Sequence, residues 1–517
     1  MFSYNKYKDQ LDIPGTEILV EENRTNSDAE GKNDIVYVPE PSSDPNDPLN
    51  WSKIWKTIHI TICFLYAMVN AGGSAWTSTV YEEFTIEFSA SYNMLNTASG
   101  LQYLFLAIGC WASQISLCLW GKRPTYLISS FLVGVGSVAF AVSKTYKGMM
   151  AYSIINGFGI APMDTVVEST IGDLFFLHEH GRLMALYTLF LSLGNSFGPI
   201  IAGYLHPWSW CNYLLIIFSG SLFIAQLLFL EESEFPARTR LLARHDASEI
   251  DTKTNVFVSV ETAPVETVSR KSFIERMAFQ PPDREKSWRV LFEIGVAPFV
   301  TLRYPAVFWA SVAYGVQICW LTLVGLTQAE FYASEPYFFS TTGIGNLSYA
   351  GVVGTVVASI YVSFSDKYHM WRTKKNHGIS EPEFRLDLTW IPIIVNCLGI
   401  CLYGYGPLYS MSWVVGAFGI GMMNFGMLCL IVVMLTYVME CYPQQMARTM
   451  VAILFVRNII ASIFSWVFQY WLDGMGIKNL TAFLTVICFA VNGGAIFFVL
   501  WGKNFRKYTS RWYNLSL

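Results

Sequence analysis

The chain has 517 residues, of which 53% are hydrophobic and only 14% are charged. Soluble proteins carry about 25% charged residues, so this composition excludes an ordinary soluble protein and indicates a chain that lies largely in lipid. The formal net charge of −4 is too small, and of the wrong sign, to attract nucleic acid, and we expect no nucleic-acid partner.

The N-terminal segment is polar and rich in Asp, Glu, Asn and Pro. It contains no apolar stretch of the kind that a cleavable signal peptide needs. A segment of this composition cannot bury enough apolar surface to fold by itself. We therefore expect residues 1–54 to form a disordered cytosolic tail, and the first spanning helix to direct insertion into the membrane.

Apolar stretches follow along the rest of the chain. A membrane-spanning helix needs about 20 mostly apolar residues, and twelve segments meet this requirement. They are residues 56–78, 93–117, 124–142, 149–174, 183–205, 211–230, 306–328, 341–364, 387–406, 411–438, 449–472 and 481–501. The sequence therefore predicts an all-α membrane protein with twelve transmembrane helices.

The basic residues predict the orientation, because Lys and Arg accumulate on the cytoplasmic side of spanning helices. Of the 34 Lys and Arg residues, 30 fall on the side that holds both termini. Only Lys144, Lys147 and Lys478 fall on the other side, and Arg457 lies inside a span. We expect both termini to be cytosolic, in a multi-pass protein of the plasma membrane.

The longest polar insertion divides the spans into two groups of six. The predicted organisation is a six-helix bundle over residues 55–230, a cytosolic central loop over 231–304, a second six-helix bundle over 305–502 and a cytosolic tail over 503–517. Two bundles of equal size are typical of transporters built from pseudo-symmetric repeats.

An acid–turn–arginine corner occurs once in each half. Asp173 ends the fourth span and Arg182 begins the fifth, while Glu440 ends the tenth and Arg448 begins the eleventh. We interpret these pairs as gating latches on the cytosolic face. The alternative is that they only cap helix ends, where acids and bases are common.

Two carboxylates, Asp164 and Glu168, lie inside the fourth span. They are four residues apart and therefore share one helix face. A carboxylate at membrane depth costs about 2.5–3.5 kcal/mol on insertion scales, so such residues usually have a function. We predict that both face a central aqueous cavity, where they exchange protons or bind a cationic solute. The alternative is a structural carboxyl bonded to neighbouring helices, and the sequence does not name the partner of Arg457.

Polar and aromatic side chains on other spans are further candidates for a solute site. Asn70 lies on the first span, Tyr314, Gln317 and Gln328 on the seventh, and Tyr437 on the tenth. Aromatic rings can stack on organic solutes or bind a cation. Many Trp and Tyr residues belong instead to the belts at the membrane surface.

Metal and cofactor sites have no support in the sequence. The seven His residues are scattered, and the ten Cys residues form no pair spaced as in zinc sites. No phosphate-binding loop for ATP is present. We expect no metal, no cofactor and no enzymatic activity.

Several motifs resemble one known family. Residues 194–203, with the sequence GNSFGPIIAG, resemble the signature on the fifth helix of drug/proton antiporters of the major facilitator superfamily. Gly121-Lys122-Arg123-Pro124 is similar to the end of the loop motif of that superfamily. Residues 44–52, 378–386 and 437–443 resemble the fungal drug:proton antiporter-1-like branch, which also includes polyamine and cation transporters.

The resemblance implies roles for several residues. Gly194, Gly198, Pro199 and Gly203 would form a tight contact between the fifth and eighth helices, with a bend at the proline. The loop motif lacks its usual Asp, because that position is Cys118, whereas the second-half copy keeps an acid, Asp366, which we assign to gating. The fourth helix has Ser153 where these antiporters often carry an Arg, so proton coupling would need another group.

Together these features predict a monomeric secondary active transporter that couples a small organic solute to protons. The fifth-helix signature favours export of drugs or toxic metabolites by antiport. The acidic pair on the fourth span leaves open proton-coupled uptake of polyamines or other organic cations. A third possibility, from another class, is a nutrient sensor that does not transport.

Overall fold

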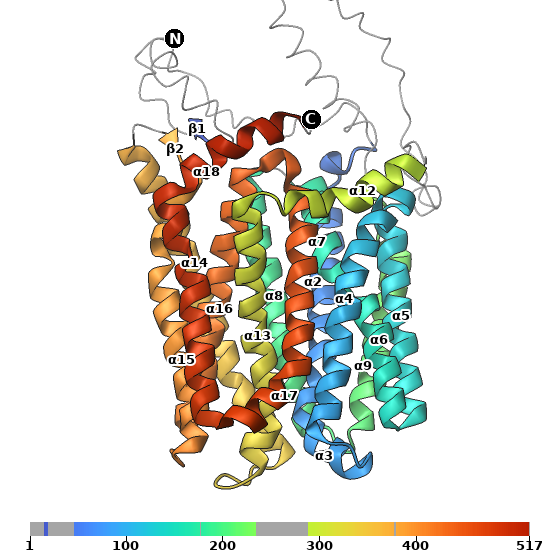
Figure 1. Cartoon of the computed structure of the whole chain (residues 1–517). Helices are drawn as coiled ribbons and strands as arrows, with labels where there is room; N and C mark the ends of the chain where they lie inside the picture. Colours follow the sequence, from blue (N-terminus) through green and yellow to red (C-terminus); the bar gives the residue numbers. More distant parts are fainter. Residues whose placement is uncertain (1–14, 19–45, 176, 234–287, 377–378, 516–517) are drawn as a thin grey trace, which may run out of the picture.

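The computed structural model describes residues 15–18, 46–175, 177–233, 288–376 and 379–515. Almost all of this chain is helical, and the helices run side by side in two groups (Figure 1). The first group holds α2 (Lys53–Ala75), η2 (Trp76–Val80), α3 (Tyr81–Glu87), α4 (Tyr92–Trp120), α5 (Lys122–Ser143), α6 (Tyr146–Ile160), α7 (Pro162–Leu174), α8 (Leu177–Tyr204) and α9 (Ser209–Phe229).

The second group follows the central insertion. It holds α12 (Trp288–Thr301), α13 (Pro305–Ala333), α14 (Thr341–Lys375), η3 (Pro382–Leu388), α15 (Trp390–Leu408), α16 (Trp413–Cys441), η4 (Pro443–Gln445), α17 (Met446–Gly493) and α18 (Ala495–Leu515). Residues 234–287 of the predicted central loop lie outside the described chain.

Ten helical stretches of the described chain are long and apolar enough to cross a membrane. One of them, Met446–Ser510, has 65 residues and would be roughly 98 Å long at 1.5 Å per residue, far more than the ~30 Å hydrocarbon core. It turns back at Gly476, where φ is 71°, and so crosses twice. The short helices α6 and α7 together make one further crossing. The described chain therefore crosses twelve times, and the predicted fold class is confirmed.

A proline explains why the fourth crossing consists of two helices. Proline has no backbone N–H and is favoured in the first turn of a helix, and Pro162 occupies that position in α7. The break places Asp164 in the first turn of α7, where the helix dipole favours a negative charge. A new helix therefore begins at Pro162, two residues before Asp164.

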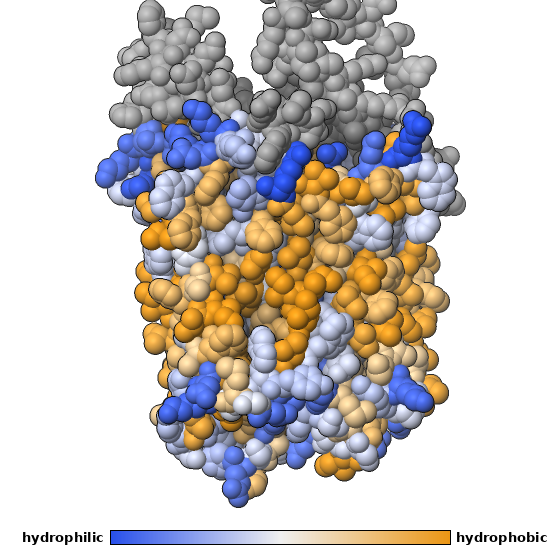
Figure 2. Space-filling model, in the orientation of Figure 1, coloured by the Kyte–Doolittle hydropathy of each residue, from blue (hydrophilic) through white to orange (hydrophobic). Residues whose placement is uncertain are grey.

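The outer surface carries an apolar band. Figure 2 shows this band across the middle of one face, with hydrophilic side chains at both ends. Large apolar side chains such as Phe131, Ile217 and Val353 are at least 60% exposed, as expected for side chains that contact lipid. The band indicates where the hydrocarbon core lies around the helices.

The two ends of the bundle differ in what they carry. One end, called the α12 end below, carries α12, α18 and a two-stranded sheet in which β1 (Glu17–Ile18) pairs with β2 (Ile379–Ser380) (Figure 1). The opposite end carries α3 and is called the α3 end. The first described residues, in β1, and the last, in α18, thus both lie at the α12 end of the bundle, as an even number of crossings requires.

Part of the segment expected to be a disordered tail is described. Thr16 accepts a hydrogen bond of 3.0 Å from Nη1 of Arg506, and η1 (Pro48–Asn50) lies just before α2, where Nζ of Lys56 donates to the carbonyl of Leu49. Residues 15–18 therefore contact the second half of the chain, and residues 46–52 contact the first.

The helix α12 occupies residues that the sequence analysis assigned to the central loop. Its 14 residues are too few to cross a bilayer, and it lies across the α12 end (Figure 1). The carbonyl of Gly295 accepts a hydrogen bond of 2.8 Å from Trp111 of α4, and Phe299 packs edge-on against Phe455 of α17. The helix therefore contacts both halves.

Candidate functional site between the two halves

A cavity of about 180 Å³ lies between the two halves. Its walls come from α2, η2, α3, α4, α6, α7 and α8 in the first half, and from α13, α14, α16 and α17 in the second. Sites for drug-sized ligands usually measure about 300–1,000 Å³. In this conformation the cavity therefore fits a solute of metabolite size.

An ion pair at the edge of the cavity joins the two halves. Asp164 of α7 is bonded to Nη2 of Arg457 of α17, and the two side chains are 5% and 6% exposed. Nη1 of Arg457 donates to the hydroxyl of Tyr314 at 2.8 Å, and Nε donates to Asn458 at 3.0 Å. The guanidinium also lies 4.8 Å from the centre of the Tyr314 ring. Each buried charge is thus paired, as the cost of burying a lone charge requires.

Glu168 lies one helical turn beyond Asp164, toward the α12 end. It is half-buried, it does not line the cavity, and the described structure gives it no hydrogen bond or ion pair. Its carboxyl still interacts electrostatically with both Asp164 and Arg457. The sequence placed the two acids together on one cavity-facing side, but only Asp164 is part of the wall.

The other side chains expected at the solute site divide into two sets. Tyr314 and Gln328 line the cavity, whereas Asn70, Gln317 and Tyr437 do not. Gln317 donates to Asn492 at 2.8 Å and accepts from Asn396 at 2.6 Å. It therefore holds helices of the second half together and is not available to a solute.

Tyr437 and Asn70 are buried outside the cavity. Tyr437 packs against Phe498 with ring centres 6.2 Å apart, so it belongs to the contact between α16 and α18. Asn70 is 2% exposed and is buried within the first half. The helical spacing that suggested these residues is correct, but the sequence does not say which side of each helix faces the cavity.

The two acid–turn–arginine corners contain different ion pairs from those expected. Asp173 is bonded to Lys122 of α5 and not to Arg182, and Glu440 accepts from Arg385 of η3 at 2.7 Å and not from Arg448. Arg182 and Arg448 are exposed. The side chain of Asp366 lies outside the described residues.

Each of these corner ion pairs therefore lies within one half of the chain. In the part of the chain that the structure describes, Lys122–Asp173 belongs to the first half and Arg385–Glu440 to the second. Such pairs hold each bundle rigid, so a gating role for the corner residues remains a prediction.

The loop motif between α4 and α5 is stabilised without its usual acid. Gly121 has φ of 90°, a conformation that other residues rarely adopt. The backbone N–H groups of Lys122 and Arg123 each donate at 3.1 Å to the carboxylate of Glu232, just after α9. A carboxylate from the end of α9 thus binds the N-terminus of α5, where Cys118 replaces the expected Asp.

The expected contact between the fifth and eighth crossings exists at Pro199 and Gly203, and the other two glycines make a second contact that was not expected. A side chain on Gly194 would meet the carbonyl of Met68, and one on Gly198 would meet the backbone of Gly72. Both neighbours belong to α2, the first crossing, and not to the eighth. Gly203 does contact the eighth crossing, since Gly345 of α14 would lie 3.2 Å from its added Cβ.

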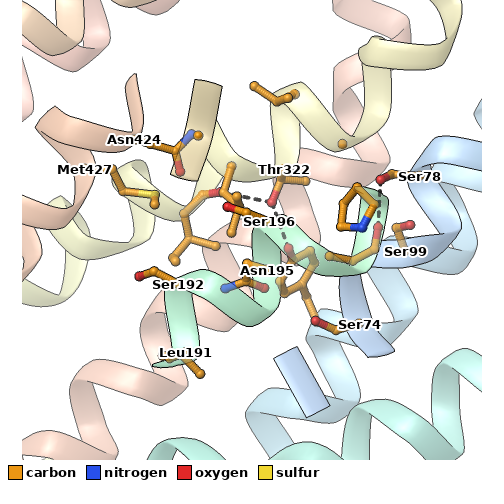
Figure 3. A pocket seen from close by; sticks show the side chains of 18 of the residues that line it. Ser74, Ser78, Ser99, Leu191, Ser192, Asn195, Ser196, Thr322, Asn424 and Met427 are labelled. Carbon is orange, nitrogen blue, oxygen red and sulfur yellow. Dashed lines mark hydrogen bonds between the residues drawn. The ribbon is translucent and has the colours of Figure 1, made fainter. Parts of the chain in front are cut away.

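The sequence analysis missed a polar stripe on the same helix. Ser192, Asn195 and Ser196 of α8 line the cavity, as does Asn424 of α16 (Figure 3). The spacing of three and four residues along α8 marks one helix face and was visible in the sequence. It was overlooked because this stretch was interpreted only as a packing motif.

Contacts between the two halves extend from the Asp164–Arg457 ion pair to the α3 end of the bundle. Near that end the described structure contains hydrogen bonds between Asn96 and Gln469 at 3.2 Å and from Ser462 to the carbonyl of Gly100 at 2.8 Å, both between α4 and α17. Thr342 of α14 donates to the carbonyl of Gly203 of α8 at 2.7 Å. The structure thus represents a conformation closed at the α3 end.

Comparison with known proteins adds the family context. The family model for the Major Facilitator Superfamily matches residues 60–465. An uncharacterised MFS-type transporter of Schizosaccharomyces pombe is 26% identical over 97% of this chain and 94% of its own length. Protein HOL1 of Saccharomyces cerevisiae is 26% identical, with 93% and 92% covered.

Other similar proteins carry more specific names. The multidrug transporter TPO1_1 of Candida glabrata is 25% identical over 90% of this chain and 79% of its own. Among solved structures, the proton:xylose symporter XylE superposes with a TM-score of 0.58 at 14% identity, over 87% of this chain and 96% of that one. At this identity the superposition shows a shared fold and nothing about substrate.

Proposed function

This chain belongs to the Major Facilitator Superfamily, and from that premise we propose that it is a proton-coupled transporter that exports small organic solutes by antiport. The observation that carries the proposal is the ion pair between Asp164 and Arg457, which joins the two halves beside the cavity. One curated relative is named as a multidrug transporter, which agrees with export.

We propose that protonation of Asp164 changes how strongly the two halves are held together. With Asp164 ionised, its attraction to Arg457 holds α7 against α17. A proton on Asp164 removes that attraction and frees the halves to move apart. We propose that the half-buried Glu168, one turn closer to the α12 end, passes the proton between Asp164 and water. Proton binding thereby becomes linked to the change of conformation that alternating access requires.

The orientation completes the proposal. The excess of Lys and Arg favours a cytosolic α12 end, and we propose that the solute enters the cavity from that side. We propose that the protein acts as a monomer in the plasma membrane.

Uptake of organic cations is the second candidate function. It is favoured by Glu168, a carboxylate beside the cavity that makes no ion pair in the described structure. A cationic solute could pair with this carboxylate on its way to the cavity. The two candidates differ in the direction in which a pH gradient drives the solute.

A pH step across proteoliposomes that contain the purified protein distinguishes these functions. For antiport with one proton, an interior one pH unit more acidic than the outside should drive about tenfold accumulation of the solute. For proton-coupled uptake, accumulation should require an acidic exterior instead. A panel of radiolabelled amines and uncharged drugs would be screened with both steps, and the gradient collapsed by an ionophore as the control. A protein that gives neither accumulation nor counterflow would be a sensor and not a transporter.

Replacing Glu168 by Gln should abolish pH-driven accumulation and leave the protein folded. The amide cannot exchange a proton, so the accumulation ratio should fall from about ten per pH unit to about one. Counterflow without a pH gradient should continue, because the cavity wall is unchanged. Ser169→Ala, at an exposed position on the same helix, is the control. Undiminished accumulation in Glu168→Gln would remove this residue from the mechanism.

A further inference from the structure

The two walls of the central cavity differ in polarity. Of the 18 residues that the first half contributes, 12 have polar side chains, and of the 16 from the second half only 6 do. Eight of these 16 are aliphatic or Met side chains, namely Ile318, Leu321, Val324, Leu326, Ile420, Met427, Leu428 and Ile431. A solute between these walls meets a polar surface on one side and an apolar surface on the other.

The polar side chains of the second wall are mostly bonded to protein already. Asn424 donates to the carbonyl of Ile420 at 3.0 Å, and Thr322 bonds both the hydroxyl of Tyr103 and the carbonyl of Ile318. Gln328 donates to the carbonyl of Ile344. Ser348 is the exception in the described structure. This wall therefore has little hydrogen-bonding capacity left for a solute.

The first wall keeps free hydrogen-bonding groups. Thr77, Gln102, Ser192, Asn195 and Ser196 line the cavity, and the described structure contains no hydrogen bond from any of their side chains. Thr77, Gln102 and Ser196 are 7–8% exposed. Polar groups inside a protein are normally hydrogen-bonded, so these groups are available to a solute or to water in the cavity. Figure 3 shows Ser192, Asn195 and Ser196 following one another along α8.

The charged side chains of the cavity wall also neutralise each other. Among the described residues that line the cavity, Asp164 is the only carboxylate and Arg457 the only basic side chain, and they are paired with each other. A solute with a net charge would enter this space without a counter-charge, which is unfavourable in a site of low dielectric constant. An uncharged solute avoids that cost and leaves the pair intact.

From these observations we propose that the transported solute is a small, uncharged, amphipathic molecule that turns its hydrogen-bonding groups toward α8 and its apolar face toward α13 and α16. This inference rests on the proposed transport function and specifies its substrate class. It favours export of uncharged solutes over uptake of organic cations.

Four probes of closely matched size test this inference. Tryptophol, tryptamine and indole-3-acetate share one apolar ring and differ in whether the end group is a hydroxyl, an ammonium or a carboxylate. Mannitol has the same number of non-hydrogen atoms as tryptophol but no apolar face. Binding to the purified full-length protein in nanodiscs would be measured with labelled probes. We expect tryptophol to bind most tightly.

Two asparagines provide a matched pair of variants. Asn195→Leu removes a free hydrogen-bonding group from the first wall, and Asn424→Leu removes one that is bonded to its own helix. Loss of one hydrogen bond to tryptophol should weaken binding about threefold to tenfold in Asn195→Leu. Binding in Asn424→Leu should change by less than about twofold. Thermal melting of both variants verifies that they fold.

Each other outcome overturns the inference. Tightest binding of tryptamine or indole-3-acetate would show that the site prefers charge, and tightest binding of mannitol would show that it lacks an apolar side. Equal effects of Asn195→Leu and Asn424→Leu would show that the free groups of α8 do not contact the solute. If none of the four probes binds but a pH step drives a charged solute, the substrate class is wrong and the transport function stands. If no solute moves at all, the transport function itself fails.

Discussion

Replacing Asp164 by Asn should abolish proton-driven accumulation and destabilise the protein. The change leaves Arg457 buried, 6% exposed and without its counter-charge. Removing one partner of a buried ion pair costs about 3–5 kcal/mol, so we expect a clear fall in the melting temperature of the purified protein. The accumulation ratio should drop to about one at any pH step, because Asn cannot bind the proton that releases the two halves.

A second variant separates the two effects of this substitution. In Asp164→Asn combined with Arg457→Met, neither position carries a charge, so Arg457 is not left without its partner. Replacing a whole buried ion pair by uncharged side chains is often neutral or stabilising, so the melting temperature should recover while pH-driven accumulation should not. Glu335→Gln, an exposed acid after α13, is the control. Proton-driven accumulation by the double variant would show that coupling lies elsewhere.

The ion pair also explains why the corner residues are poor candidates for coupling. In the described chain, Lys122–Asp173 and Arg385–Glu440 each join helices of the same half, so protonation of these acids would loosen one bundle without changing the distance between bundles. The pair Asp164–Arg457 spans the two halves directly. Of these three pairs in the described chain, it is the one at which we expect a proton to have the largest effect on the relative position of the halves.

The fold was predictable because it depends on local properties of the sequence. Length and hydropathy identify each span, and the distribution of Lys and Arg is counted directly. The exceptions have local causes. Helix α12 was missed because 14 residues are too few to cross a membrane. The predicted span ended at residue 364, short of the end of α14 at Lys375, because the last turns of that helix are polar.

The site was less predictable because it depends on how helices are rotated and paired. The periodicity of a helix shows which residues share a face, but not which neighbour that face meets. Gln317 and Tyr314 are three residues apart on one helix, and yet one holds the second half together while the other lines the cavity. The partner of Arg457 lies 293 residues away in sequence, and no local pattern connects them.

The fifth-helix motif predicted one close helix contact, and the structure contains two. Gly203 packs against α14, the eighth crossing, as expected, whereas Gly194 and Gly198 pack against α2. Small residues permit close packing on any side of a helix, so the composition alone does not identify the partner. The same helix also carries Ser192, Asn195 and Ser196 on the cavity side.

The contact between α8 and α2 leads to a second large expected effect. Gly198→Ala should destabilise the protein, because the added Cβ would meet the Gly72 carbonyl and lie 2.8 Å from the Gly72 Cα. Both atoms are backbone, so no side chain can rotate out of the way. Forcing an extra methyl group into a packed contact costs about 1–3 kcal/mol. We expect a lower melting temperature and slower counterflow, since α8 connects the first half to α14.

Gly220 of α9 provides the matched control, because a Cβ added there has no neighbour within 4 Å. Alanine is a better helix former than glycine by about 0.8–1 kcal/mol, so Gly220→Ala should melt at the same temperature as the wild type or higher. The two substitutions add the same methyl group to helices of the same half and differ only in what that group touches. A Gly198→Ala protein that melts and transports like Gly220→Ala would show that α8 and α2 are free to separate. The helix contact would then not constrain the movement of the cavity wall on α8.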